Sequence, residues 1–270
     1  MERTLALICG AGPVPAWMAR QARQDGWRVL AFTFALAEGM AACADRVVPS
    51  RVTELGPVLA AFQREGVEAA LFAGKFWMHE LLHLDGAQVD AATMSFAARA
   101  ESRSDTQLSR VVLATLEGLG ISILDPRRFM GDWLAGAGVL TARTPDEGEW
   151  RDVRAGLRVA RALADHGVGQ TVVLRHGVVT AAEAAEGTTA AIERGVGLAG
   201  KGAVIVKAVS SDHDYRFDLP AVGAETIEAA ARGEAGVLAI QAGRVAILER
   251  ARALAQADVA GLAVVAVDEE

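Results

Sequence analysis

Short apolar runs in the first half of the chain alternate with longer segments in which apolar residues recur at helical spacing. Runs without polar interruption are typical of strands buried on both faces, and the longer period is typical of helices. This alternation predicts a parallel sheet covered by helices on both sides. The predicted strands are 5–9, 28–33, 69–73 and 121–124, and the predicted helices are 16–25, 52–65 and 105–119.

The second half of the chain has glycine turns between short apolar runs, and two of these runs, 169–174 and 177–181, predict a β-hairpin. Apolar periodicity is lost over residues 131–150, which indicates a connection between two domains. We therefore expect an α/β chain with one parallel-sheet domain at 1–135 and a mixed α/β domain at 136–270. The remaining predicted strands are 203–209, 236–240 and 244–248, and the remaining predicted helices are 149–165, 224–232 and 250–260.

The charge and cysteine content exclude several classes of protein. A formal net charge of -7 argues against a nucleic-acid binder, because neutralising phosphates requires a basic face. The two cysteines, Cys9 and Cys43, form no disulfide framework and suit a reducing, cytoplasmic compartment. No signal peptide and no apolar run long enough to span a bilayer is visible, so we expect any membrane contact to be peripheral.

The first strand is followed by the glycine-containing turn GAGPVP, with glycines at Gly10 and Gly12. Backbone N–H groups at a strand-to-helix turn can approach a phosphate at the N-terminus of the helix. The turn lacks the third glycine of the dinucleotide fingerprint, and Pro13 and Pro15 each remove a donor. The alternative is a tight turn that only starts the sheet.

The segment HELLH, His79 to His83, matches the pattern in which two histidines one helical turn apart bind Zn²⁺ beside a glutamate base. A zinc hydrolase that uses His79, Glu80 and His83 is therefore one hypothesis. Leu84, Asp85 and Gly86 follow directly and would end the helix at the second ligand, and no downstream motif clearly supplies a third ligand.

Polar residues are most concentrated in the second half, in EAAEGTT at 183–189 and DHDYRFDLP at 212–220. If the second segment is extended, Asp212, Asp214 and Asp218 share one face with Arg216. Such a face can hold Mg²⁺ through carboxylate oxygens, activate water and neutralise a phosphate. The alternative is an exposed acidic loop in which Arg216 pairs with a neighbouring carboxylate.

Taken together and in order, these motifs resemble the UDP-2,3-diacylglucosamine pyrophosphatases of lipid A synthesis, the type unrelated to calcineurin-like phosphoesterases. The resemblance spans nearly the whole chain, and its C-terminal combination of an EGT turn, a lysine strand and an Asp-x-Arg-x-Asp-x-Pro run is specific. The motifs that carry it are GAGPVP, Gly74-Lys75, SDTQLSR near Asp105, GVGQ at 167–170, EAAEGTT, Val206-Lys207 and DYRFDLPAVGAETI.

The resemblance implies a Rossmann-like N-terminal domain, a C-terminal α/β domain, and hydrolysis of a lipid-linked sugar nucleotide between them. It also implies that the protein uses a divalent cation, typically Mg²⁺, and forms a homodimer. A further implication is that it binds peripherally to the inner face of the membrane, where it takes up its substrate. Carried onto matching positions, it implies that Asp214 and Asp218 bind the metal or activate water, with Arg216 on the diphosphate. The substrate-binding positions that we expect are Gly10, Gly12, Lys75, Gln170, Glu183, Glu186, Gly187, Thr188, Thr189 and Lys207.

This sequence departs from the usual family pattern at three positions near the expected chemistry. Members generally carry aspartate where Thr189 and Gly167 stand, and glutamine where His213 stands. The loss of two carboxylates motivates a second hypothesis, that the chain is a catalytically altered relative that binds a nucleotide or an acylated sugar without cleaving it.

Overall fold

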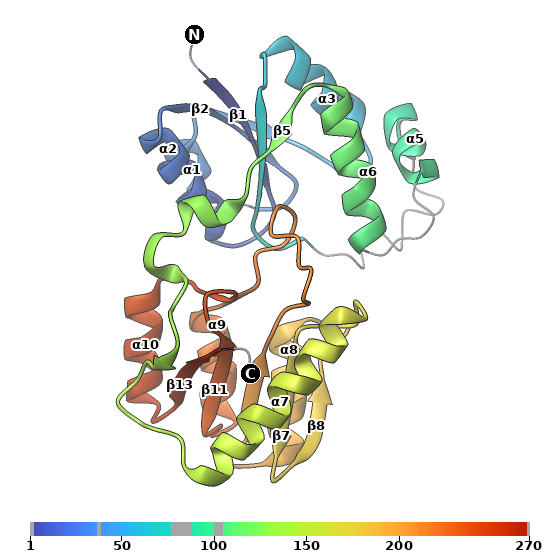
Figure 1. Ribbon diagram of the computed structural model, residues 1–270. Helices are drawn as coiled ribbons and strands as arrows, with labels where there is room; N and C mark the ends of the chain where they lie inside the picture. Colours follow the sequence, from blue (N-terminus) through green and yellow to red (C-terminus); the bar gives the residue numbers. More distant parts are fainter. Residues whose placement is uncertain (1–2, 37–38, 77–87, 100–104, 269–270) are drawn as a thin grey trace. The chain divides into compact units, whose positions relative to one another are not determined.

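The structure of the protein is a computed structural model that describes residues 3–36, 39–76, 88–99 and 105–268 (Figure 1). The chain forms two compact units, Met1–Phe129 with Asp214–Leu219, and Met130–His213 with Pro220–Glu270. The sequence-based boundary at residue 135 assigns residues 214–219 to the second domain, whereas in the structure they belong to the first unit. The HELLH segment lies outside the described residues.

The first unit is built around a parallel sheet with the strand order β3-β2-β1-β4-β5. Its strands are β1 (Arg3–Cys9), β2 (Trp27–Thr33), β3 (Arg46–Pro49), β4 (Ala69–Ala73) and β5 (Ser122–Ile123). Its helices are α1 (Val14–Gln24), α2 (Met40–Cys43), α3 (Leu55–Arg64), α5 (Ala91–Arg99), α6 (Asp105–Gly118) and the 3₁₀ helix η1 (Pro126–Phe129).

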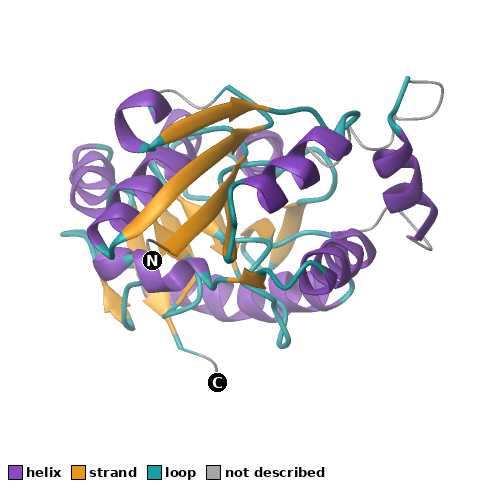
Figure 2. Cartoon of the chain, turned by 90° about the horizontal axis from the view of Figure 1, so that it is seen from above, coloured by secondary structure: helices purple, strands orange, loops and turns teal. Residues whose placement is uncertain are grey.

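Helices cover both faces of this sheet because successive side chains of a buried strand point to opposite sides. Ala6 and Ile8 of β1 pack in one cluster with residues of α3 and α6, among them Phe62 and Leu116. Helix α1 contacts β1, β2 and β4, and its buried face includes Met18. Figure 2 shows the strands and helices in a second view. The arrangement confirms the predicted parallel-sheet α/β domain.

The second unit contains a mixed sheet with the order β6-β13-β11-β9-β7-β8, in which β9, β11 and β13 are parallel. A separate two-stranded sheet joins β10 and β12. The strands are β6 (Gly138–Val139), β7 (Thr171–Arg175), β8 (Val178–Ala182), β9 (Val204–Lys207), β10 (Ala221–Val222), β11 (Val237–Gln241), β12 (Ala246–Ile247) and β13 (Ala263–Val267). The helices are η2 (Gly131–Trp133), α7 (Glu147–Asp165), α8 (Thr188–Ala199), α9 (Ala224–Arg232) and α10 (Arg250–Val259).

The two faces of the second sheet carry different helices, as Figure 1 shows. Val153 and Ala160 of α7 pack with Val204 and Val206 on one face. Ile192 of α8 belongs to the cluster on the opposite face, together with residues of α9 and α10. The predicted mixed α/β domain is therefore confirmed, with α7 on one side and α8, α9 and α10 on the other.

The predicted hairpin is formed by the antiparallel strands β7 and β8. His176 and Gly177 have φ angles of 52° and 79° at its tip, the backbone region that tight two-residue hairpin turns require. The buried carboxylate of Asp152 in α7 accepts hydrogen bonds from both of their amides, each at 2.7 Å. This side chain fixes the hairpin to the helix that covers it.

Several elements of the structure differ from the sequence-based expectations, and β3 is among those that the sequence does not predict. The sequence does not predict helix α8, because Gly195 and Gly197 interrupt its apolar pattern. It also does not predict strand β13, whose apolar run directly follows a helical segment. The strand expected at 244–248 is reduced to β12, which pairs with β10 instead of joining the large sheet.

Within the described ranges, none of the helices combines the length and the apolar character that crossing a bilayer requires.

Candidate functional site

The first polar site is the carboxyl edge of the N-terminal sheet between β1 and β4. From this point the strand order runs in opposite directions along the sheet, with β2 beside β1 and β5 beside β4. Connections leave such a point on opposite sides, and ligands of open parallel sheets bind there. The expected substrate residues Gly10, Gly12 and Lys75 all lie in the two turns that leave β1 and β4.

These two turns are hydrogen-bonded to each other. The amide of Ala11 donates to the Lys75 carbonyl at 2.8 Å, and the Lys75 amide donates back to the Ala11 carbonyl at 2.9 Å. A Cβ on Gly10 would lie 2.5 Å from the Lys75 carbonyl oxygen, so only glycine permits this approach. The Gly10 amide donates to the Ala73 carbonyl at 2.9 Å, so Gly12 and Val14 carry the remaining N–H groups between residues 10 and 15.

The loop Asp214–Leu219 packs in this same unit, although it lies far along the chain. The Phe217 ring centroid is 5.5 Å from that of Phe72 in β4. Tyr215 is 6% exposed, and the guanidinium carbon of Arg127 lies 3.9 Å from the centroid of its ring. These aromatic contacts bring the Asp-x-Arg-x-Asp run to the first unit.

The loop is not extended, which corrects the expectation that Asp212, Asp214, Asp218 and Arg216 share one face of a strand. Residues 215–217 form a turn, with the Phe217 amide donating to the Asp214 carbonyl at 3.4 Å. The carboxylates of all three aspartates are exposed.

The two rings of this loop give the physical reason for the turn. In a strand, Tyr215 and Phe217 would point to the same side, because alternate residues share a face. The turn instead lets Tyr215 pack against Arg127 and lets Phe217 pack against Phe72.

Arg216 pairs with the carboxylate two residues before it, as the alternative interpretation of this run expects. Its Nη2 lies 2.7 Å from Asp214 Oδ2, its Nε lies 2.9 Å from Oδ1, and its amide donates to Oδ1 at 3.1 Å. The hydrogen bond to Asp214 is the main reason that the pKa of Arg216 is raised above its ordinary value. Asp214 thus holds Arg216 as a fixed cation at the surface.

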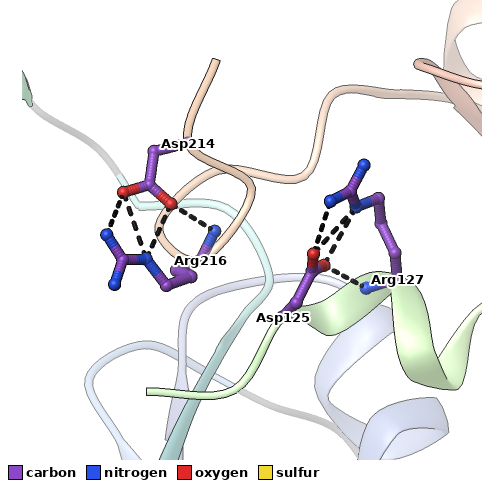
Figure 3. Close-up of polar contacts among 4 residues, drawn as sticks. All are labelled: Asp125, Arg127, Asp214 and Arg216. Atoms are coloured by element: carbon purple, nitrogen blue, oxygen red, sulfur yellow. Dashed lines mark hydrogen bonds and ion pairs between the residues drawn. The ribbon is translucent and has the colours of Figure 1, made fainter. Parts of the chain in front are cut away.

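A second Asp-x-Arg fork of the same form lies in the first unit, after β5. Arg127 Nη2 is 2.6 Å from Asp125 Oδ2, and the Arg127 amide donates to Asp125 Oδ1 at 2.9 Å. Figure 3 shows both forks. Burial by itself would raise the pKa of Asp125, but the hydrogen bonds from Arg127 bring that pKa below its ordinary value. The negative charge of Asp214 tends to raise the pKa of Asp125, so the two carboxylates interact electrostatically.

Sequence reasoning missed Asp125 and Arg127. The signal that could have found them is the repeated spacing, because Asp125-Pro126-Arg127 and Asp214-Tyr215-Arg216 both place an arginine two residues after an aspartate. Their proximity in space depends on the contact between Arg127 and Tyr215, which no local pattern reveals.

The second polar site lies at one edge of the mixed sheet in the second unit. Lys207, only 6% exposed at the end of β9, donates from Nζ to Thr188 Oγ1 at 2.9 Å. The Thr188 hydroxyl donates in turn to Glu183 Oε1 at 2.8 Å. Glu183 Oε2 accepts from the backbone amide of Gln170 at 3.3 Å. The structure therefore brings together four of the expected substrate-binding residues. A buried cation and a buried carboxylate share one hydroxyl between them.

The other expected residues of this half surround the same turn. Gly187 precedes α8, and Thr189 Oγ1 donates to Glu225 Oε1 at 3.0 Å. Glu186 accepts from Arg194 at 2.5 Å, and this hydrogen bond is the main reason that the pKa of Glu186 is lowered. Glu186 and Thr189 are therefore bound to surface partners, whereas Thr188 bonds the buried lysine and Glu183 accepts from Thr188.

The donor set for a metal ion is sparse. Within the ranges that the structure describes, no group of three His, Cys, Asp or Glu side chains is placed to hold a cation. Mg²⁺ commonly takes one or two carboxylates and completes its shell with water and substrate phosphates. Asp214 and Asp218 are exposed and could each supply one oxygen to such a partial shell, although in this structure the Asp214 carboxylate is bonded to Arg216.

Comparison with known proteins gives a consistent result over the whole chain. Residues 4–133 match the family model of the LpxI N-terminal domain, and residues 136–265 match that of the LpxI C-terminal domain. The chain is 31% identical over 278 aligned residues to UDP-2,3-diacylglucosamine pyrophosphatase LpxI of Caulobacter vibrioides, covering 98% of each chain.

Similarity to solved structures is weak. Glycinamide-RNase-transformylase T of Mycobacterium tuberculosis is 19% identical with a TM-score of 0.26, covering 66% of this chain and 43% of its own. N5-carboxyaminoimidazole ribonucleotide synthetase of Thermotoga maritima is 11% identical with a TM-score of 0.23, covering 67% and 41%. The chain thus spans less than half the length of either structure, and likenesses with TM-scores this low support no conclusion about fold or function.

Proposed function

Because this chain belongs to the LpxI family, we propose that it hydrolyses the pyrophosphate bond of UDP-2,3-diacylglucosamine in lipid A biosynthesis. The products are UMP and 2,3-diacylglucosamine 1-phosphate. The observation that carries the proposal is the 31% identity to a UDP-2,3-diacylglucosamine pyrophosphatase over 98% of both chains. The enzyme is accordingly a hydrolase that acts on a sugar-nucleotide pyrophosphate.

The Asp214 loop supplies the reacting side chains in this proposal. Arg216 is held by Asp214, and a guanidinium offers the same fork to a phosphate that it offers to a carboxylate. A diphosphate that binds Arg216 competes with Asp214 and releases this carboxylate. Asp214 or Asp218 then orients the attacking water and takes its proton, while the bond from the sugar-side phosphorus to UMP breaks.

The Lys207 site is the second position that we assign to substrate phosphate. Lys207 is a buried cation with Thr188 and Glu183 fixed beside it, so it needs little reorganisation when a phosphate approaches. Gln170, Glu186, Gly187 and Thr189 surround this position. The turns at Gly10, Gly12 and Lys75 hold part of the uridine nucleotide in the same proposal.

A divalent cation, Mg²⁺, belongs to the proposal as a partner of the diphosphate. When bound, it neutralises charge on the phosphate oxygens. Asp214 and Asp218 are the residues that would hold it, with the rest of its shell taken from substrate and water. We further propose that the protein acts in the cytoplasm as a homodimer and meets its lipid substrate by peripheral contact with the inner membrane.

The test is hydrolysis of UDP-2,3-diacylglucosamine in water enriched in ¹⁸O, followed by ³¹P NMR and mass spectrometry. We expect UMP release, dependence on Mg²⁺ with loss on chelation, and ¹⁸O in diacylglucosamine 1-phosphate. Binding of the substrate without UMP release would instead support the altered relative suggested by Gly167 and Thr189. Stoichiometric zinc in the purified protein, with activity lost on mutation of His79, would support the zinc hydrolase.

A further inference from the structure

A cavity of about 280 Å³ lies in the second unit, on the α7 side of the mixed sheet. It is lined by Arg154, Leu157, Arg158, Arg161, Ala208, Gln241 and Asp268. Ala208, Gln241 and Asp268 stand at or just beyond the ends of the parallel strands β9, β11 and β13. The carboxyl ends of parallel strands are the usual place for ligands in α/β folds.

The lining is unusually basic for this protein. Three arginines and one aspartate line the cavity, whereas the whole chain carries a formal net charge of -7. The residues Arg154, Arg158 and Arg161 follow one another at spacings of four and three along α7, so their side chains share one face of the helix. The cavity therefore presents a concentrated positive charge.

The three neighbouring arginines are expected to destabilise helix α7. Like charges at spacings of three and four residues destabilise a helix, and neither Arg154 nor Arg158 has an acidic residue one turn away in α7. Across the described part of the chain, neither of these two side chains forms an ion pair. An anion between the guanidinium groups would remove the repulsion.

The cavity is distinct from the Lys207 site. Ala208 packs with the α7 cluster, whereas the preceding residue Lys207 reaches Thr188 at the start of α8 on the opposite face. Gln241, one of the lining residues, is 2% exposed and accepts from the Val209 amide at 3.1 Å, which fixes its side chain. Two basic sites thus lie at the same edge of the sheet, one on each face.

We propose that this cavity binds the phosphate group of a small phosphorylated ligand. Guanidinium groups bind phosphate through two parallel hydrogen bonds, and two arginines one turn apart can address different oxygens of the same group. The volume lies near the lower limit of ligand pockets, which fits one phosphate-bearing group better than a whole lipid-linked nucleotide. The site is an addition to the proposed hydrolytic function and does not require it.

The test uses the full chain and measures binding by isothermal titration calorimetry with inorganic phosphate, UMP and glucosamine 1-phosphate. Co-sedimentation with phosphatidylglycerol vesicles, compared with phosphatidylcholine vesicles, tests whether a lipid headgroup supplies the phosphate. The variants are the double substitution R154Q/R158Q and, as a matched control, R151Q. Arg151 is exposed on the same helix but does not line the cavity.

We expect the Kd for at least one phosphate probe to rise about tenfold or more in R154Q/R158Q and to stay within about twofold in R151Q. We also expect the double variant to be at least as stable as the wild type to heating without ligand, because the repulsion is relieved. Saturable binding of soluble probes identifies a soluble ligand, and binding only to phosphatidylglycerol identifies a headgroup. Equal affinity in all variants, or no binding of any probe by the wild type, would overturn the proposal whether or not the protein hydrolyses its substrate.

Discussion

The guanidinium of Arg127 lies over the ring of Tyr215, with 3.9 Å between its carbon and the ring centroid. Arg127 also holds Asp125, so one side chain links a loop after β5 to the loop that carries Asp214. The contact stabilises the position of Asp214 from within the first unit. We therefore propose that Arg127 is a positioning residue for the Asp214 loop.

The contact between Arg127 and Tyr215 should appear as a coupling energy. In a double-mutant cycle of Arg127→Gln and Tyr215→Leu, we expect a coupling of about 0.5–1 kcal/mol in the free energy of unfolding, the usual size of a partly exposed cation–π pair. Urea unfolding of the four proteins measures it. The same cycle with Arg128→Gln, an exposed neighbour, should give a coupling near zero. Equal couplings in both cycles would show that the stacking has no energetic role.

The Asp125 fork should make stability depend on acid pH. The folded protein lowers the pKa of Asp125, so its contribution to the free energy of unfolding is complete above the unfolded value of about 4 and is lost as the pH falls through the lower folded value. We expect the stability difference between wild type and Asp125→Asn to be largest near neutral pH and to shrink below about pH 4. Urea unfolding at several pH values checks this. A difference that grows on acidification would contradict the assigned direction.

The hydroxyl of Thr188 should contribute more to stability than that of Thr189. Thr188→Val removes the group shared by Lys207 and Glu183, so buried polar atoms lose a partner, and we expect a loss of about 1–3 kcal/mol. Thr189→Val removes only an exposed contact with Glu225 and should cost about 0.5 kcal/mol or less. Thermal and urea unfolding compare the two. Similar losses would mean that the buried network is not a distinct stabilising element.

The close approach of the turns after β1 and β4 should not tolerate a side chain at Gly10. A Cβ there would lie 2.5 Å from a backbone oxygen, so Gly10→Ala should destabilise the first unit by at least about 1–3 kcal/mol. Gly118→Ala is the matched control, because Gly118 is exposed in a helix with open space around it and should gain up to about 1 kcal/mol. Opposite signs in urea unfolding are the expected result. A neutral Gly10→Ala would show that the two turns can separate freely.

The sequence predicts β1 and β4 of the first sheet well, because both are short apolar runs that end at clear glycine turns, but it does not predict β3. It also predicts the grouping of Glu183, Thr188 and Lys207, although only through a family resemblance. Helix α8 escapes prediction because its glycines hide the apolar period. The turn at 215–217 escapes prediction because it depends on Phe72 and Arg127, which lie far away along the chain.

The most direct test of the proposed function compares Asp214→Asn and Asp218→Asn with Asp212→Asn in the rate of UMP release. Asp212 is an exposed carboxylate two residues before Asp214 and has no role in the proposed reaction, so it controls for charge and location. We expect the first two variants to lose about a hundredfold or more in kcat while their unfolding midpoints stay close to that of the wild type. Asp212→Asn should remain within about twofold of the wild type. Full activity in both Asp214→Asn and Asp218→Asn would contradict the account.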